Sequence, residues 1–191
     1  MKIVFATNNR NKVAEITEIL PGGFEILNLK EIGCYEKLPE SQKTIKGNAI
    51  QKAKFVFDNY GYNCFADDTG LEIDVLNGEP GVFSARYAGT SCNSEDNIHK
   101  VLQKMNQQEN RNARFRTVIA LIIDGESISF EGIVEGKIID VGIGENGFGY
   151  DPIFQPLGKK ETFAQMSKKE KGIISHRGIA TRKLTKHLQN L

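Results

Sequence analysis

Polar and apolar residues alternate most regularly between residues 113 and 123. The positions that share one predicted strand face are Phe115, Thr117, Ile119, Leu121 and Ile123. A spacing of two is the period of a β-strand. The dipeptide Asp124-Gly125 follows, which is typical of a hairpin turn, and a second extended stretch covers 127–139. The pattern therefore predicts two long strands joined by a tight turn.

The first part of the chain changes from strand spacing to helix spacing. Residues 2–6 are an apolar run typical of a short strand, and residues 7–12 are polar. From Val13 to Leu20 the apolar residues follow helical spacing, and Pro21-Gly22-Gly23 stops the predicted helix. Residues 25–28 form a second candidate strand. An early strand–helix pattern followed by a long hairpin predicts an α/β fold with a mixed sheet.

A second helix is predicted over residues 48–60, after an irregular stretch at 29–46. Its apolar residues form one stripe, and Lys52 lies at the border of that stripe. Two interpretations of Lys52 stay open. Its stem packs while its ammonium reaches water, or its ammonium points into a crevice to meet phosphate.

Three later helices begin with recognisable capping residues. Ser94 is the candidate cap of one helix, and Ser167 with Glu170 fits a capping box at the next. Ser175 precedes the last helix, so His176-Arg177 lies in its first turn. Cations oppose the helix dipole at that end, which favours a ligand rich in hydrogen-bond acceptors.

Length and charge limit the possible functions. A chain of 191 residues fits a single domain over residues 1–191, and 39% hydrophobic and 26% charged residues are ordinary for a globular protein. With 25 basic and 24 acidic residues there is no overall field to attract a nucleic-acid polymer or a membrane surface. No segment is apolar enough for a membrane span, and the first six residues do not make a signal peptide. Three widely spaced cysteines suit a reducing cytoplasm.

Two adjacent carboxylates follow the short apolar run Cys64–Ala66. The run predicts a strand that ends at Asp67-Asp68, after which Thr69-Gly70 turns the backbone away. In α/β proteins ligands bind where strands end, and two neighbouring carboxylates repel each other unless a cation such as Mg²⁺ relieves them. The alternative is an Asp-rich turn that caps backbone amides, and this stretch alone favours the turn.

Two further stretches carry candidate chemistry. The polar residues 7–12 precede a helix, where free backbone N–H groups and the helix dipole favour an anion such as phosphate. Plain helix capping explains them about equally well. Residues 145–154 combine Gly147 and Gly149 with Phe148 and Tyr150, which can offer flat faces to a ring; a rigid turn is the alternative. Taken together, these parts favour a nucleotide site.

Five motifs in this order resemble those of the Ham1/RdgB family, whose members are inosine triphosphate pyrophosphatases. The motifs are Thr7-Asn8-Asn9-Arg10-Asn11-Lys12, Ala66-Asp67-Asp68-Thr69-Gly70-Leu71, Gly78-Glu79-Pro80-Gly81-Val82-Phe83-Ser84-Ala85-Arg86-Tyr87, Phe148-Gly149-Tyr150-Asp151-Pro152 and Ser175-His176-Arg177-Gly178. The resemblance covers nearly the whole chain. It implies a Ham1/ITPase-like fold with two lobes around a nucleotide cleft. It also implies hydrolysis of ITP, dITP and XTP to the monophosphate and pyrophosphate, with Mg²⁺, by a cytoplasmic homodimer.

The resemblance also implies roles for single residues. Asp68 is expected to accept a proton and bind the metal, with Glu40 or Asp67 as a second metal ligand. Lys12 and Lys52 are expected to meet the phosphate charge while a metal-activated water attacks the α-phosphate. The implied substrate-binding residues are Thr7, Asn8, Asn9, Arg10, Asn11, Lys12, Thr69, Phe148, Gly149, Tyr150, Asp151, Lys171, His176 and Arg177.

The sequence departs from the family pattern near Glu40. Residues 41–43 read Ser-Gln-Lys where Thr-Gly is usual, and Gly47 stands where a glutamate often precedes Asn-Ala. Glu40 is therefore placed mainly by its spacing to Lys52. Two alternatives remain for the whole chain: a Maf-like pyrophosphatase of modified pyrimidine nucleotides, and a non-catalytic nucleotide-binding module.

Overall fold

The computed structural model describes residues 2–17, 19–20 and 24–190. Its strands are β1 Lys2–Phe5, β2 Glu25–Leu27, β3 Cys64–Ile73, β4 Asn112–Ile123, β5 Glu126–Ile138 and β6 Phe154–Pro156. Its α-helices are α1 Arg10–Thr17, α2 Ile45–Tyr60, α3 Ser94–Lys104, α4 Lys168–Ile174 and α5 His176–Leu188. In the part of the chain so described, no helix is both long and apolar enough to cross a membrane.

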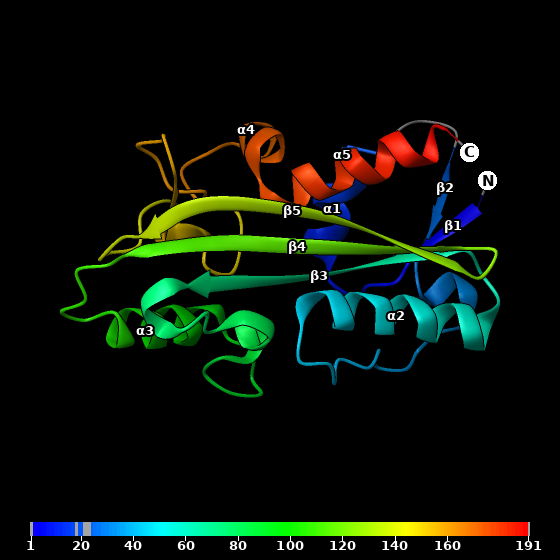
Figure 1. Cartoon of the computed structure of the whole chain (residues 1–191), viewed down its shortest axis with the longest axis horizontal. Helices are drawn as coiled ribbons and strands as arrows, with labels where there is room; N and C mark the ends of the chain where they lie inside the picture. The colour runs from blue at the N-terminus through cyan, green and yellow to red at the C-terminus, as the bar shows by residue number, and fades with distance from the viewer. Residues whose placement is uncertain (1, 18, 21–23, 191) are drawn as a thin grey trace. The chain divides into compact units, whose positions relative to one another are not determined.

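The strands form one mixed sheet in the order β2-β1-β3-β4-β5-β6. Figure 1 labels β1 to β5. β1 pairs in parallel with β2 and with β3, whereas β6 pairs antiparallel with β5. The predicted mixed α/β sheet is thus confirmed. The parallel pairs belong to the strand–helix segments at the start of the chain, because a parallel pair needs a crossover connection.

The long hairpin is also confirmed, with strand ends within a residue of those predicted. Asp124 and Gly125 both have positive φ values, 50° and 89°. Two central residues with positive φ are the requirement of the hairpin turn whose twist matches that of the flanking strands. Asp and Gly adopt this conformation more readily than other residues, so the turn follows from the local sequence.

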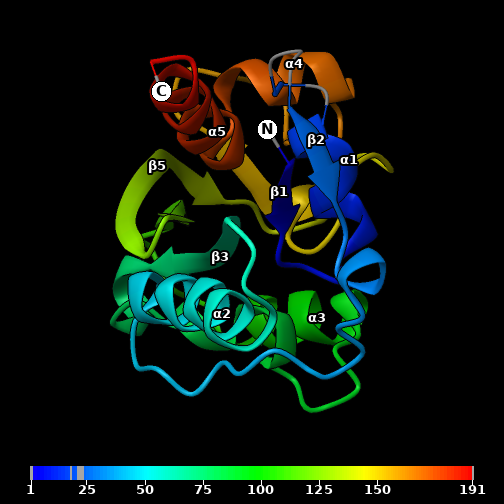
Figure 2. The same cartoon turned by 90° about the vertical axis from the view of Figure 1, so that its right-hand side faces the viewer.

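The chain divides into two compact units, each made of separate segments. Unit 1 contains the described parts of residues 1–68, 117–132 and 177–191, and unit 2 contains 69–116 and 133–176. Unit 1 has an α/β/α arrangement: α2 covers one face of its part of the sheet, and α1 and α5 cover the opposite face (Figures 1 and 2). The single domain predicted over 1–191 stays a prediction.

Burial in unit 1 follows from helices on both faces. Residues 117–122 of β4 are all buried. The alternating sequence pattern that predicted this strand is therefore not matched by alternating buried and exposed side chains here. One face packs on α1 and α5 through a cluster that includes Ile3, Phe65, Ile119, Ile16 and Leu184. A strand buried on both faces reads as a continuous apolar run, as the stretch from Val118 to Ile123 does.

Unit 2 has its own core of aromatic and aliphatic side chains. The buried members include Leu71, Val101, Met105, Phe115, Tyr150, Phe154 and Phe163. Val101 lies on the buried side of α3, and Met105 follows the helix directly. The cap of α3 is Asn93, whose side chain accepts from two backbone N–H groups, rather than the predicted Ser94. The capping box of Ser167 and Glu170 at α4 is confirmed.

Helices α1 and α2 both begin three residues before the predicted positions. Asn9 accepts from the N–H groups of Asn11 and Lys12, at 3.0 and 3.3 Å, and Thr44 accepts from Gly47 N at 3.0 Å. These caps satisfy backbone donors that lack a partner within the helix, so the helices extend into stretches expected to be loops. The predicted stop at 21–23 lies outside the described residues.

The largest correction concerns Asp67-Asp68. The predicted strand end does not exist, because β3 runs without interruption from Cys64 to Ile73. Successive side chains of a strand point to opposite faces. The two carboxylates therefore lie on opposite faces of unit 1, and the turn predicted at Thr69-Gly70 is extended strand.

Candidate active site

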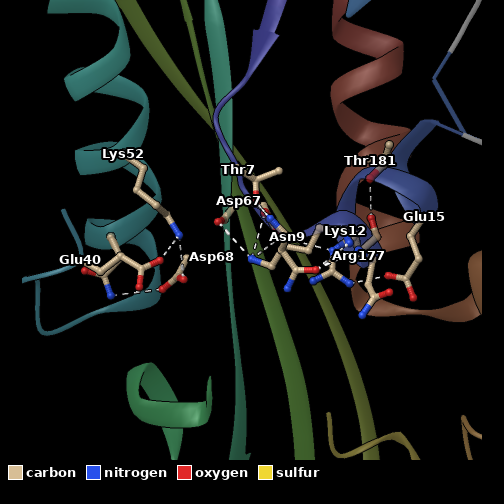
Figure 3. Close-up of polar contacts among 12 residues, drawn as sticks. Thr7, Asn9, Lys12, Glu15, Glu40, Lys52, Asp67, Asp68, Arg177 and Thr181 are labelled. Atoms are coloured by element: carbon tan, nitrogen blue, oxygen red, sulfur yellow. Dashed lines mark hydrogen bonds and ion pairs between the residues drawn. The ribbon is translucent and has the colours of Figure 1, made fainter. Parts of the chain in front are cut away.

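Asp68 lies on the face of unit 1 that α2 covers, and its partner there is Lys52. The Lys52 ammonium is 3.1 Å from Asp68 Oδ1 and 2.6 Å from Glu40 Oε1, as Figure 3 shows. The Lys52 side chain is only 6% exposed. Burial alone lowers the pKa of Lys52, but the charges of Asp68, Asp67 and Glu40 outweigh burial and raise it. The structure thus brings Lys52, Glu40 and Asp68 together, and Lys52 stays charged.

Asn48 is a part of this group that the sequence analysis did not name as a site residue. Its amide donates to Asp68 Oδ2 at 3.2 Å, and its Oδ1 accepts from Gln42 N at 2.9 Å. Asn48 is buried one helical turn before Lys52 on α2. That spacing of four is the signal that could have indicated it, because residues i and i+4 share a helix face.

Opposing effects act on the pKa of the Asp68 carboxyl group. Burial raises its pKa, Lys52 and Lys12 lower it, and Glu40 raises it; the net pKa lies above the ordinary value. A carboxyl group with a raised pKa binds a proton more readily than an exposed aspartate does. This property suits a general base, which works best when its pKa is closer to the operating pH.

Asp67 points to the other face and meets two cations there. Its side chain is fully buried, Lys12 Nζ lies 3.0 Å from its Oδ2, and Arg177 Nε lies 3.3 Å from the same oxygen. Burial alone raises the pKa of Asp67, but Lys12 and Arg177 lower it to about 2. Asp67 is therefore ionised and bound by cations of its own chain.

The polar residues 7–12 form the start of helix α1 and the bend before it. Thr7 Oγ1 accepts from Asn9 N at 3.2 Å, and Asn9 then caps the helix. Among the implied substrate residues, Asn8, Asn9, Arg10 and Asn11 are exposed, while Lys12 is half-buried. Burial lowers the pKa of Lys12, and Asp67 opposes that effect only in part. Capping and access for an anion therefore coexist in this segment.

The donor set of unit 1 fits a magnesium ion with few protein ligands. Among the residues that the structure describes, no three His, Cys, Asp or Glu side chains gather where they could hold a metal ion. Two carboxylates, Asp68 and Glu40, do reach a single cation, the ammonium of Lys52. Mg²⁺ is usually held by one or two carboxylates together with substrate phosphates and water. Asp67 fits less well, because it points to the opposite face of β3 from Asp68.

The glycine-rich loop of unit 2 is organised by Asp151. Its Oδ2 accepts from Phe148 N at 2.8 Å and from Lys171 Nζ at 2.6 Å. Gly147 has a φ of +76°, and a Cβ on it would lie 2.0 Å from Asp151 Oδ2. Only glycine fits there, so the loop is built around this buried carboxylate.

The two aromatic residues of this loop have different environments. Phe148 is half-buried, and the Lys171 ammonium lies 4.9 Å from its ring centroid. Tyr150 is only 4% exposed and donates its hydroxyl hydrogen to Ser84 O at 2.8 Å. Phe148 can thus still offer ring surface, whereas Tyr150 anchors the loop to the segment Gly81–Arg86.

His176 and Arg177 are consecutive but have separate partners. The His176 ring stacks on Phe115, with centroids 4.5 Å apart and planes at 16°. Arg177 contacts Asp67 and Glu15 in unit 1. Their role in substrate binding stays a prediction. Thr69 is half-buried within β3.

We expect Tyr150→Phe to lower the free energy of unfolding by about 1–3 kcal/mol, because it leaves the buried carbonyl of Ser84 without this donor. Urea denaturation measures the change. Tyr35→Phe is the matched control, because Tyr35 is 79% exposed. Equal stability of both variants would mean that the Tyr150 hydroxyl does not anchor the loop.

Comparison with known proteins gives consistent results along the chain. A model described as the Ham1 family matches residues 3–187. A dITP/XTP pyrophosphatase of Flavobacterium psychrophilum is 56% identical over 190 residues, 100% of each chain. The structure of the Staphylococcus aureus Ham1 protein has a TM-score of 0.92 and 40% identity, covering 100% of this chain and 99% of that one. A HAM1 protein from Coxiella burnetii has a TM-score of 0.93 and 37% identity, with 100% of both chains covered.

Proposed function

The chain belongs to the Ham1 family, and on that premise we propose how its residues release pyrophosphate from dITP and XTP. It is a hydrolase of non-standard purine nucleoside triphosphates, a dITP/XTP pyrophosphatase in its activity. The observation that best supports a catalytic centre is the buried Lys52 ammonium between Glu40 and Asp68. The fold matches Ham1 structures over the full chain.

Asp68 is the proposed general base. It takes the proton of the water that attacks the α-phosphorus, and the bond from that phosphorus to the pyrophosphate oxygen breaks. The amide of Asn48 donates to Asp68 Oδ2 and fixes that oxygen, which supports this role. A positioned base of this kind contributes about 10²- to 10⁴-fold to a rate.

Lys12 and Lys52 are the proposed electrostatic partners of the phosphates. Both ammonium groups are mostly buried, so their charges act in a medium of lower dielectric than water. They neutralise the negative charge that the leaving pyrophosphate gains. The N–H groups at the start of α1 offer further donors to an anion.

Mg²⁺ is the proposed cofactor, held by Asp68 and Glu40. When bound, it would act as a Lewis acid on phosphate oxygens and lower the pKa of a coordinated water. Asp67 is proposed to balance the charges of Lys12 and Arg177 rather than to bind the metal. The contacts of Asp67 with both cations support this division.

Base selection is proposed to depend on the oxygen at position 6 of the purine. Hypoxanthine and xanthine accept a hydrogen bond there, whereas adenine presents an amino donor. A buried donor left without an acceptor rejects the wrong base by about 10⁴-fold or more in favourable cases. The proposed contacts are the loop Phe148–Asp151, Lys171 and His176, and the family resemblance supports them. Guanine shares the oxygen, so its rejection must depend on its 2-amino group.

The activity is tested by pyrophosphate release, with Mg²⁺, from ITP, dITP, XTP, GTP, ATP and UTP. We expect fast release from the first three and slow release from the others. Equal release from all six would keep the catalytic proposal and remove the proposed base selection. Preference for UTP would favour a Maf-like enzyme, and no release from any would favour a binding module. The full-length similarity to dITP/XTP pyrophosphatases argues against both.

We also propose that the enzyme acts as a homodimer in the cytoplasm, which the family resemblance supports. Light scattering after size-exclusion chromatography measures the mass in solution. A dimer is expected near twice 21.3 kDa. A single species at 21.3 kDa would contradict the proposal.

A further inference from the structure

The segment 39–44 carries Glu40 and contributes little to the hydrophobic core. Its neighbours Leu38 and Ile45 are buried, at 8% and 5% exposure, whereas all but the first residue of the segment are exposed. Apolar packing therefore fixes the two ends of the segment and not the residues between them. Glu40 lies in that middle part, yet its carboxylate contacts the buried Lys52 ammonium at 2.6 Å. Core packing alone does not place this carboxylate.

Polar side chains on one side of α2 hold the backbone of this segment. Asn48, Gln51 and Lys52 are related by spacings of three and four, so they lie on the same side of the helix. Gln51 accepts from Ser41 N at 3.0 Å and donates to Ser41 Oγ at 2.8 Å. Asn48 accepts from Gln42 N at 2.9 Å. These hydrogen bonds of Asn48 and Gln51 form a clamp on the two residues that follow the metal-site carboxylate.

The clamp brings the segment so close to α2 that Gly47 has no room for a side chain. A Cβ on Gly47 would lie 2.8 Å from Gln42 Cβ and 2.9 Å from Thr44 Oγ1. Thr44 Oγ1 is the end of a side chain and can shift slightly, but Gln42 Cβ is bonded to the backbone and moves only with it. Gln42 and Gly47 both belong to the departures from the family pattern. These two departures are therefore in contact, and only one of the two positions has space for a Cβ.

Resting on the function proposed above, we propose that Gln51 and Asn48 are positioning residues for Glu40, and that Gly47 supplies the space that this clamp requires. The clamp fixes the backbone of the segment and thereby holds the Glu40 carboxylate against the ammonium that also contacts Asp68. Gln51 itself touches neither substrate nor metal. Its effect is on the geometry of the two carboxylates proposed to hold Mg²⁺, an ion that demands near-ideal octahedral coordination.

The first test uses Gln51→Ala, which removes both hydrogen bonds to Ser41 and keeps a good helix former. We expect the Mg²⁺ concentration for half-maximal pyrophosphate release from dITP to rise about 10-fold, the low end of the range for losing a residue that orients a metal ligand. At saturating Mg²⁺, kcat should equal that of the wild type, a split that general damage to the fold would not produce. The matched control is Gln103→Ala, because Gln103 is an exposed glutamine of α3 and should leave both values unchanged.

The second test exchanges the Cβ between Gln42 and Gly47. Gly47→Ala alone should push the segment away from α2 and raise the half-maximal Mg²⁺ concentration as Gln51→Ala does. Adding Gln42→Gly removes the Cβ that the new methyl group meets. In the Gln42→Gly background, Gly47→Ala should therefore have little further effect, which is the non-additivity expected of two residues in contact.

A measurement without metal or nucleotide tests the clamp itself. Hydrogen exchange of the Ser41 and Gln42 N–H groups, followed by NMR in the metal-free protein, should be about 5- to 10-fold faster in Gln51→Ala and in Gly47→Ala, the factor that loss of one hydrogen bond gives. Exchange at Ile119 should stay unchanged, because this residue is fully buried in the sheet of unit 1.

Three results would overturn the proposal. Exchange as slow in Gln51→Ala as in the wild type would mean that the clamp does not hold the segment. Faster exchange with an unchanged Mg²⁺ requirement would mean that the clamp does not position Glu40. An equal effect of Gly47→Ala with and without Gln42→Gly would mean that the two positions do not share one space. Failure of the proposed function would instead appear as absent pyrophosphate release in the wild type, and the exchange measurement would still decide whether the clamp exists.

Discussion

Replacing Asp68 by asparagine is expected to lower kcat for pyrophosphate release from dITP by about 10²- to 10⁴-fold, the range for loss of a positioned general base. Asparagine has nearly the same shape and can still accept a hydrogen bond from Lys52, which lies 3.1 Å from Asp68 Oδ1. It cannot take a proton from water at neutral pH. It also removes one of the two carboxylates proposed to hold Mg²⁺.

The measurement is steady-state pyrophosphate release at saturating dITP over a range of Mg²⁺ concentrations. Asp74→Asn is the control, because Asp74 is an exposed carboxylate that pairs with Arg114 outside the proposed machinery. If metal binding were the whole effect, high Mg²⁺ would restore kcat in the Asp68 variant. A kcat within threefold of the wild type at every Mg²⁺ concentration would exclude Asp68 as the base.

Replacing Asp67 by asparagine is expected to lower the free energy of unfolding by about 3–5 kcal/mol, the usual result of removing one partner of a buried ion pair. Two buried cations, Lys12 and Arg177, lose their shared carboxylate in this variant. Urea unfolding at pH 7 measures the difference. The control is Asp140→Asn, because Asp140 is 89% exposed and its pair with Arg111 should be worth at most about 1 kcal/mol.

Wild type and Asp67→Asn also allow a test of the Asp67 pKa through the pH dependence of stability. Burial raises the pKa of this carboxyl, but Lys12 and Arg177 bring it down to about 2, below the ordinary value of 3.8. A depressed pKa in the folded state adds stability above the unfolded value, and this stability is lost as the pH falls toward the folded value. The stability difference between wild type and Asp67→Asn should therefore be constant above about pH 5 and narrow below pH 4. A difference that stays constant down to pH 3 would contradict the lowered pKa.

Structural features that depend only on residues close together in the sequence were predicted well. The hairpin around Asp124-Gly125 and the capping box of Ser167 and Glu170 are contained in short stretches, so local conformational preferences specify them. The starts of α1 and α2 were placed three residues late. The first three residues of α1 are polar, and in α2 Lys46 and Gly47 separate the buried Ile45 from Asn48, so the apolar spacing did not reach either helix start.

The sequence analysis predicted which residues belong to the site, and the tertiary structure decided which side chains each of them contacts. Lys52 between Glu40 and Asp68 fits the interpretation in which this lysine points inward. His176 and Arg177 are consecutive in the sequence, but their neighbours differ: the His176 ring stacks on Phe115, and Arg177 contacts Asp67. Two residues that the sequence analysis did not name, Asn48 and Gln51, lie within one helical turn before Lys52.

Asp67-Asp68 shows most clearly what each level of structure determines. The sequence by itself determined that two carboxylates follow an apolar run, and that at least one cation would be needed to neutralise them. The tertiary structure decided that β3 continues through both, so that strand geometry sends them to opposite faces. The helices on those faces then give each carboxylate its own cations: Lys52 of α2 to Asp68, and Lys12 of α1 with Arg177 of α5 to Asp67. No local pattern could specify this, because Lys12 and Arg177 lie 55 and 110 residues from Asp67 and meet it only when the helices pack on the sheet.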